Sequence, residues 1–179
     1  SSHKIGGPQG VGALVTAAGI VLPRLIEGGG QEKRQRGGTE NVAGIAAFGA
    51  AAAEAIAQLD AYQKLAELRD RIENHLRPSN RITIHGANAP RVSNTSMVTV
   101  SGVSGETLLM AFDLDGVALS AGSACSSGST RFTHVLRSMG VEACGDVASL
   151  RISLGWNSTA EDVDNFLTVW DKVMQRLIR

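Results

Sequence analysis

A lysine near the start of the chain has neighbours that favour chemistry over a surface role. Lys4 follows Ser1, Ser2 and His3 and precedes the turn Gly6-Gly7-Pro8. Hydroxyls and an imidazole beside an amine, on a turn that approaches its surroundings closely, can hold a phosphate while the amine forms a Schiff base. The same residues match the Ser-x-x-Lys of certain acyl-transfer hydrolases, but no Ser-Asp-Asn or Lys-Thr-Gly follows. The pattern therefore favours a Schiff-base lysine beside a bound phosphate.

A cysteine lies in a second unusual segment, a run of small and polar residues. Cys125 is preceded by Ser-Ala-Gly-Ser-Ala and followed by Ser-Ser-Gly-Ser-Thr. A thiol in such a loop contributes little packing, so we interpret it as a nucleophile on a loop that can swing, the alternative being an incidental surface thiol. Cys144, between Ala143 and Gly145, is expected to be a buried structural residue. Two cysteines are too few for a disulfide framework, which fits a reducing cytoplasm.

An arginine interrupts an apolar strand-like run further along the chain. Arg151 lies within Leu150–Ser153, and a buried, unpaired guanidinium would cost several kcal/mol. A carboxylate held by two parallel hydrogen bonds is the natural partner. The spacing leaves open whether that carboxylate belongs to a substrate or to a structural aspartate.

The composition excludes several classes of function. The 179 residues are 43% hydrophobic, and 17 basic residues balance 17 acidic ones, so no basic face for nucleic acid is expected. The apolar runs are shorter than the roughly 20 residues of a membrane span, and the N-terminal residues do not resemble a secretory signal. The histidines and cysteines lack zinc-site spacing, and Asp113-Leu114-Asp115-Gly116 lacks the further ligands of a calcium loop.

The first third of the chain is predicted to hold two strands, a loop and a helix. Apolar, β-branched runs predict buried strands over 10–16 and 20–26. Residues 27–39 contain five glycines and a cluster of charges, which indicates a loop whose backbone approaches something closely. The alanine-rich residues 42–59 predict a largely buried helix.

The remaining residues alternate between helical and strand patterns. An amphipathic helix is predicted over 62–76, with Leu65, Leu68, Ile72 and Leu76 on one stripe and Glu73 away from it. Strands are predicted at 81–85, 97–100, 117–120 and 150–153, with helices at 106–112 and 133–139. A capping box of Ser158 and Glu161 predicts the start of a last helix that reaches residue 177. This alternation indicates an α/β or α+β layered fold.

Taken together, four motifs resemble the cysteine desulfurases of the NifS/IscS type. They are Ser-His-Lys with Gly-Pro-x-Gly-x-Gly-Ala-Leu, Gly-Gly-Gly-Gln-Glu with Arg-Gly-Gly-Thr, Ser-Ala-Gly-Ser-Ala-Cys, and Leu-Arg-Ile-Ser-Leu-Gly. They occur in the family's order across essentially the whole chain. The resemblance implies the pyridoxal-phosphate (PLP) dependent fold type I of class V aminotransferases, which is α/β, and a homodimer. It also implies conversion of L-cysteine to L-alanine, with the sulfur left as a persulfide for iron–sulfur cluster assembly or other acceptors.

The resemblance also implies a role for each matching residue. Lys4 matches the Schiff-base lysine, Ser1 and His3 match contacts to the cofactor phosphate, and Thr39 matches the threonine that reaches the phosphate of the other subunit's cofactor. Arg151 matches the arginine that binds the substrate carboxylate. Cys125 matches the nucleophile that accepts the sulfur and passes it to a scaffold protein. As a persulfide, Cys125 is also expected to be a transient metal ligand shared with that partner.

The resemblance divides the chain into two parts. Residues 1–61 match the end of the large PLP-binding domain, with the lysine strand, the glycine-rich loop and a long helix, and 62–179 match the small domain with the cysteine loop. Since relatives begin well upstream of the lysine, we expect the chain to be a C-terminal part with an incomplete cofactor site. The alternatives are a selenocysteine lyase or another class V PLP enzyme, and a truncated, non-catalytic interaction module.

Overall fold

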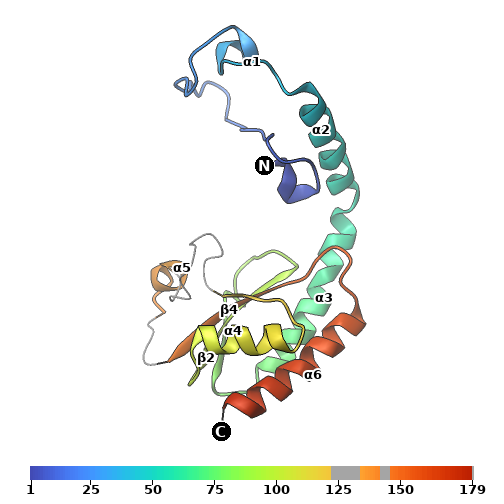
Figure 1. Cartoon of the computed structure of the whole chain (residues 1–179), viewed down its shortest axis with the longest axis vertical. Coiled ribbons are helices and arrows are strands. Elements are labelled where there is room, and N and C mark those ends of the chain that lie inside the picture. The colour runs from blue at the N-terminus through green and yellow to red at the C-terminus, as the bar shows by residue number, and fades with distance from the viewer. Residues whose placement is uncertain (122–133, 142–145, 179) are drawn as a thin grey trace. The chain divides into compact units, whose positions relative to one another are not determined.

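The fold combines helices and strands in two compact units. The structure is a computed structural model and describes residues 1–121, 134–141 and 146–178 (Figure 1). The chain separates into the units Ser1–Leu59 and Asp60–Arg179, and each is described by itself. The observed division falls after Leu59, two residues before the boundary that the sequence analysis expected after residue 61. The assignment of these units to a large and a small domain stays a prediction.

An antiparallel sheet forms the centre of the second unit. Among the described residues its strands are β1 (Ile82–His85), β2 (Thr95–Ser101), β3 (Ser120–Ala121) and β4 (Val147–Ser153), in the order β1-β2-β4-β3. The strands predicted at 81–85, 97–100 and 150–153 are thus confirmed with shifted ends. The strand predicted at 117–120 is reduced to Ser120–Ala121, because the Val117 amide donates to the Phe112 carbonyl and so belongs to the end of a helix.

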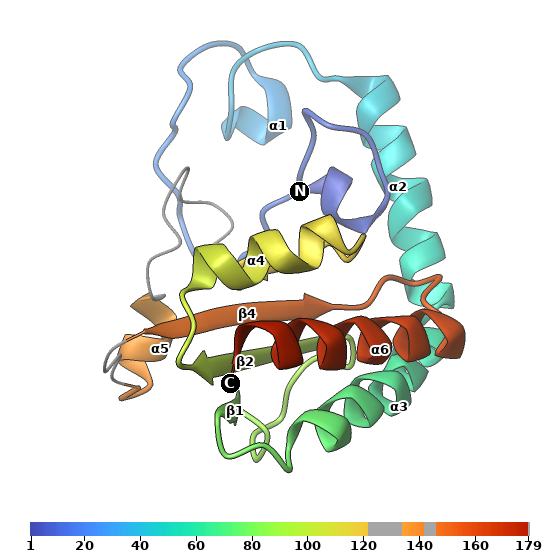
Figure 2. The same ribbon diagram turned by 60° about the horizontal axis from the view of Figure 1, so that its bottom comes forward.

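Three helices cover one face of this sheet (Figure 2). They are α3 (Leu59–Leu76), α4 (Gly105–Leu114) and α6 (Ala160–Leu177). Phe112, Phe166 and Trp170 join α4 to α6, with ring centroids 5.3 to 6.2 Å apart. The short helix α5 (His134–Ser138) contributes the buried Leu136. The core consists of apolar residues from these helices and from the strands β2 and β4, with Val103: Ile72, Leu76, Val98, Val100, Val103, Leu108, Ala111, Phe112, Ala148, Leu150, Ile152, Val163, Phe166, Trp170 and Val173.

The last helix begins one residue later than the sequence predicts. Thr159, not Ser158, is the N-cap, and Asp162, not Glu161, completes the capping box. The Asp162 amide donates to Thr159 Oγ1 at 3.2 Å, and the Thr159 amide donates to the Asp162 carboxylate at 2.8 Å. Ser158 instead accepts a hydrogen bond from the Gly155 amide and so closes the turn before the helix. The prediction of a capping box was right in kind and wrong in register.

The first unit contains much less regular structure than the sequence predicts. Its elements are the 3-10 turn η1 (Ser2–Ile5), the single turn α1 (Gln31–Arg34) and the helix α2 (Val42–Ala57). The strands predicted at 10–16 and 20–26 are wrong, because no described segment forms a ladder of strand hydrogen bonds with either run. Val15 is 91% exposed and Leu25 is 95% exposed. The helix predicted at 42–59 is confirmed as α2, but only its Gly44 is buried.

The glycine-rich loop is closed by a contact between the backbones of its two ends. The Gly37 amide donates to the Ile26 carbonyl at 3.0 Å, and a Cβ on Gly37 would lie 2.8 Å from the Gly28 Cα atom. A side chain at residue 37 would therefore force the two backbones apart. At the tip of this loop, Glu32, Lys33 and Arg34 adopt left-handed backbone angles, with φ of 48°, 54° and 67°. The close backbone approach predicted for this loop is thus made by the loop to itself.

No single helix in the described parts of the chain is long and apolar enough to cross a membrane. The consecutive helices α2 and α3, taken as one segment, do reach the necessary length and apolar composition.

Candidate functional site

The turn η1 presents the lysine that the sequence singles out. Lys4 is exposed, and its amine makes no hydrogen bond or ion pair with the described residues. The Lys4 amide donates to the Ser1 carbonyl at 3.3 Å, and the Ser2 amide donates to the Val11 carbonyl at 3.1 Å. These bonds hold the turn against the segment that follows it. Ser1, His3 and Lys4 are therefore neighbours at the surface of one tight turn.

The packing beneath this turn explains the glycine that follows it. Ser2 is fully buried, its hydroxyl makes no hydrogen bond within the described ranges of the chain, and any Cβ on Gly7 would collide with it. The glycine thus lets the chain fold back beneath η1, and the exposed side is left to an amine, a hydroxyl and an imidazole. This set of groups fits PLP, because the amine can attach its aldehyde and the hydroxyl and imidazole can contact a phosphate.

Thr39 belongs to the same unit and lies at the end of the glycine-rich loop. Arg36 Nη1 donates to the carbonyls of Gly37 and Gly38, at 3.1 and 3.2 Å, and so holds the backbone just before Thr39. The Thr39 side chain is exposed and lines an open hollow of about 1070 Å³ in the first unit, together with the 10–16 segment and part of α2. Lys4 is not among the residues that line this hollow.

Arg151 lies at the middle of the sheet in the second unit. It is on strand β4, where it pairs with Met97 of β2 on one side and with Ser120 of β3 on the other. Its guanidinium is half-buried and donates one long hydrogen bond, 3.4 Å, to Ser120 Oγ. No carboxylate among the described residues forms an ion pair with Arg151, so the described part of the chain does not supply the structural aspartate that the sequence left open.

The remaining predicted residue, Cys125, lies outside the described residues, as does Cys144. The predicted roles of Cys125, as sulfur acceptor and as transient metal ligand, therefore stay predictions. In the described ranges, no three side chains of His, Cys, Asp or Glu gather in a way that could hold a metal ion.

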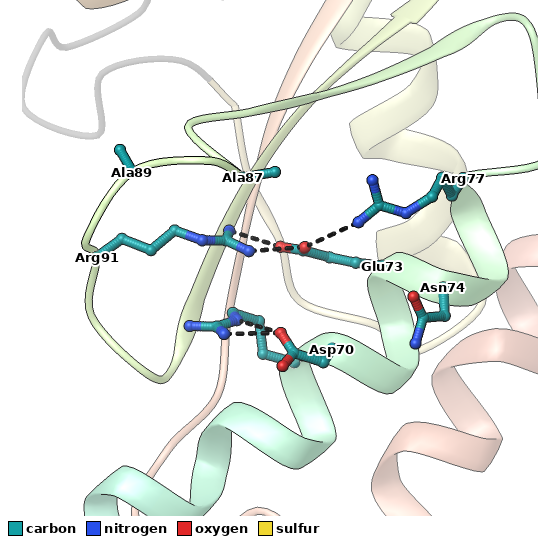
Figure 3. Close-up of a pocket in the computed structure, with 8 residues that line it drawn as sticks. Asp70, Glu73, Asn74, Arg77, Ala87, Ala89 and Arg91 are labelled. Atoms are coloured by element: carbon teal, nitrogen blue, oxygen red, sulfur yellow. Dashed lines mark hydrogen bonds and ion pairs between the residues drawn. The ribbon is translucent and has the colours of Figure 1, made fainter.

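A buried ion pair that the sequence analysis missed lines a polar cavity of about 450 Å³ on the second unit (Figure 3). The stripe predicted for the 62–76 helix is confirmed, but Glu73, which was placed on its solvent side, is only 2% exposed. Both of its oxygens accept hydrogen bonds from Arg91, at 2.6 and 2.7 Å, and one accepts a further bond of 2.5 Å from Ser96. Arg77 approaches the same carboxylate at 3.9 Å.

This pair has a clear electrostatic signature. Burial raises the pKa of the Glu73 carboxyl, but the hydrogen bonds from Arg91 and Ser96 and the charge of Arg91 lower it more, so the pKa lies below its ordinary value of 4.5. The hydrogen bond to Glu73 correspondingly raises the pKa of Arg91. Both directions describe one buried, fully charged pair, which ties the connection between β1 and β2 to α3. The two partners are 18 residues apart in the sequence, and only the fold brings them together. No local sequence pattern could therefore have revealed the pair.

With the site described, the chain can be placed in a family. The aminotransferase class-V family matches residues 1–166, and the chain belongs to this family. It is 39% identical, over 99% of its length, to "Cysteine desulfurase IscS" of Methanosarcina thermophila, and 39% identical to the "IscS-like cysteine desulfurase" of Mycobacterium tuberculosis. The resemblance to NifS/IscS-type cysteine desulfurases is thereby confirmed.

Solved structures agree with this placement. The NifS-like protein from Rickettsia africae superposes with a TM-score of 0.84 and 35% identity over 98% of the chain. The α/β fold of the chain is therefore that of NifS-like proteins. The chain covers 44% and 46% of the two curated relatives and 46% of the Rickettsia structure, and so spans about half the length of the proteins it matches.

Proposed function

We propose that the protein is a PLP-dependent cysteine desulfurase. The observation that carries the proposal is the 39% identity to curated cysteine desulfurases over 99% of the chain. Lys4 would attach the cofactor, Ser1 and His3 would contact its phosphate, and Thr39 would reach the phosphate in the other subunit of a homodimer. When bound, PLP supplies an electron sink that lets the substrate sulfur leave.

The residues of this chain account for the remaining steps. Arg151 binds the α-carboxylate of L-cysteine, and the guanidinium donors that make no contact with described residues support that role. The thiolate of Cys125 attacks the substrate sulfur, so a C–S bond breaks while an S–S bond forms. The net exchange turns L-cysteine and the Cys125 thiol into L-alanine and a Cys125 persulfide, and it needs no external oxidant. We further propose that the persulfide is passed to a scaffold protein in the cytoplasm.

The proposal is tested on the full-length protein, loaded with PLP and supplied with L-cysteine. We expect alanine and, with a reductant, sulfide to be released in equal amounts. Cys125→Ser should lower this rate at least about 100-fold, because the hydroxyl is a far weaker nucleophile than a thiolate. Cys144→Ser is the matched control and should keep the parental rate.

Three outcomes would contradict the proposal. Release of alanine at the parental rate by Cys125→Ser would remove the nucleophile from the mechanism. A protein that stays colourless after addition of PLP, with no alanine from L-cysteine, would favour the non-catalytic module. A much faster reaction with selenocysteine than with cysteine would instead identify a selenocysteine lyase.

A further inference from the structure

The sheet of the second unit has a face without core residues, which we call the polar face. Side chains alternate along a strand, so the residues opposite to Val98 and Leu150 point away from the three helices. The register places these residues in rows across the sheet, and the two central rows matter here. One row is Thr83, Thr99 and Ser149, and the other is His85, Met97, Arg151 and Ser120.

On the polar face, Thr99 already has a partner. His85 Nε2 lies 2.9 Å from Thr99 Oγ1, in a hydrogen bond that crosses from one row to the other. Burial lowers the pKa of His85, so its imidazole is neutral at neutral pH. Arg151 is then the one charged side chain that the described strands place on this face.

Ser149, by contrast, has no partner among the residues that the structure describes. It is 3% exposed, and its hydroxyl is buried without a hydrogen bond. A buried hydroxyl without a partner is costly, and such groups call for an explanation. Ser149 stands two residues before Arg151 on the same strand and the same face, about 6.6 Å away along the strand. An arginine side chain that folds back along the strand can cover this distance.

We propose that Ser149 is a positioning residue for Arg151, and that its hydroxyl accepts a hydrogen bond from the guanidinium when a carboxylate is bound. The inference rests on the proposed role of Arg151 as the carboxylate-binding residue. The long bond from Arg151 to Ser120 is weak and is given up easily. A guanidinium has five donors, so it can hold a carboxylate with two and still donate to Ser149. Binding of the ligand thus also pairs the free hydroxyl.

The chain offers a matched control for this role. Ser153 lies two residues after Arg151 on the same face of β4, so the two serines flank the arginine at equal spacing. Ser153, however, is exposed and its hydroxyl can bond to water. Replacing each serine by alanine removes the same atom at the same distance, but only the change at Ser149 removes a buried acceptor.

The test uses the full-length, PLP-loaded protein. For Ser149→Ala we expect the KM for L-cysteine to rise about fivefold, with kcat within about twofold and the Tm equal to or above the parental value, because the hydroxyl that is lost is buried and has no partner among the described residues of the unliganded protein. Ser149→Thr, which keeps a hydroxyl, should restore a KM close to the parental value. Ser153→Ala should leave both constants unchanged. In an Arg151→Ala background, Ser149→Ala should have no further effect.

The outcomes separate this inference from the proposed function. Three results would overturn the positioning role. They are an unchanged KM in Ser149→Ala, an effect of this change that persists without Arg151, and a fall in Tm in which kcat drops by the same factor by which KM rises. If the parental protein releases no alanine, binding of L-alanine followed by NMR titration replaces the kinetics. A weaker affinity of Ser149→Ala for L-alanine would then support the positioning role, and an equal affinity would refute it.

Discussion

Glu73 illustrates at the scale of one residue how a carboxylate can be buried and remain charged. Its two oxygens accept four contacts, from Arg91, Ser96 and Arg77, while the side chain is 2% exposed. Removing one partner of such a pair leaves the other charge without compensation. The pair fixes the position of the β1–β2 connection at a single point on α3.

We predict that Glu73→Gln lowers the free energy of unfolding by about 3 kcal/mol, because Arg91 loses its ionic partner in a buried site. Urea unfolding at neutral pH measures this change. Asp164→Asn is the control, since it removes the exposed pair with Arg71 and should cost less than about 1 kcal/mol. A cost at Glu73 as small as the cost at Asp164 would contradict the structural role of the buried pair.

The pH dependence of this difference has a definite sign. The folded pKa of Glu73 lies below the ordinary value of 4.5, so the folded state favours the charged carboxylate. The stabilisation is therefore fully present above pH 4.5 and is lost as the pH falls through the lowered pKa. Unfolding curves of the parental protein and of Glu73→Gln should converge in that acidic range. A gap that stays constant down to pH 2 would contradict the charge as its cause.

The residues with chemistry could be selected from sequence because their neighbours are unusual within a few positions. Lys4 beside Ser1 and His3 is such a case, and the structure places the three on one turn. Glu73 and Ser149 could not be selected in this way. Glu73 looks like a solvent-facing helix residue until Arg91 is brought to it, and the isolation of the Ser149 hydroxyl depends on the register of three strands.

At the scale of elements, the start of α6 depends on reciprocal bonds between side chains and backbone. Thr159→Ala is expected to lower the free energy of unfolding by about 1 kcal/mol, because the first turn loses an acceptor for its amides. Thr168→Ala is the matched control in the same helix. Thr168 is exposed and only donates back to the Asp164 carbonyl, so its loss should be neutral or slightly stabilising. Thermal or urea unfolding of the two variants, side by side, checks the difference.

Periodicity predicted the elements of the second unit well and those of the first unit poorly. The stripe of Leu65, Ile72 and Leu76 defines α3 because a helix of 3.6 residues per turn must bury one side. The runs at 10–16 and 20–26 have strand-like residues, but a strand also requires a neighbour with which to exchange hydrogen bonds. Whether such a neighbour exists depends on the rest of the sheet, so it cannot be predicted from the residues of the run itself.

At the scale of the whole chain, the two units should differ in local stability. The second unit has the apolar core, whereas Ser2, Gly37 and Gly44 are the buried residues of the first. Of the amides in residues 11–26, only that of Ile20 donates to a backbone carbonyl. We predict that amides in β2 and β4 exchange with solvent only on global unfolding of their unit, while those of 11–26 exchange rapidly. Hydrogen exchange of this 179-residue chain measures both, and equal protection would contradict the structure.

The order of motifs along the chain was sufficient to predict the family, whereas the division into domains after residue 61 stays a prediction. Four short motifs spread over essentially the whole length constrain the family far more than any one of them does. The residues that pack against each exposed apolar run could not be predicted in the same way. An apolar side chain indicates that it is buried by other atoms, but it does not indicate which residues supply them.

The contact between Gly28 and Gly37 closes the charged loop at its base. Its two ends meet backbone to backbone, so residues added at the tip need not move these ends apart, as long as Arg36 still holds the backbone before Thr39. Loop closure becomes more costly only slowly as residues are added. A longer or differently charged tip could therefore be inserted between these glycines without moving the two ends of the loop, whereas a single methyl group added at residue 37 would force these ends apart.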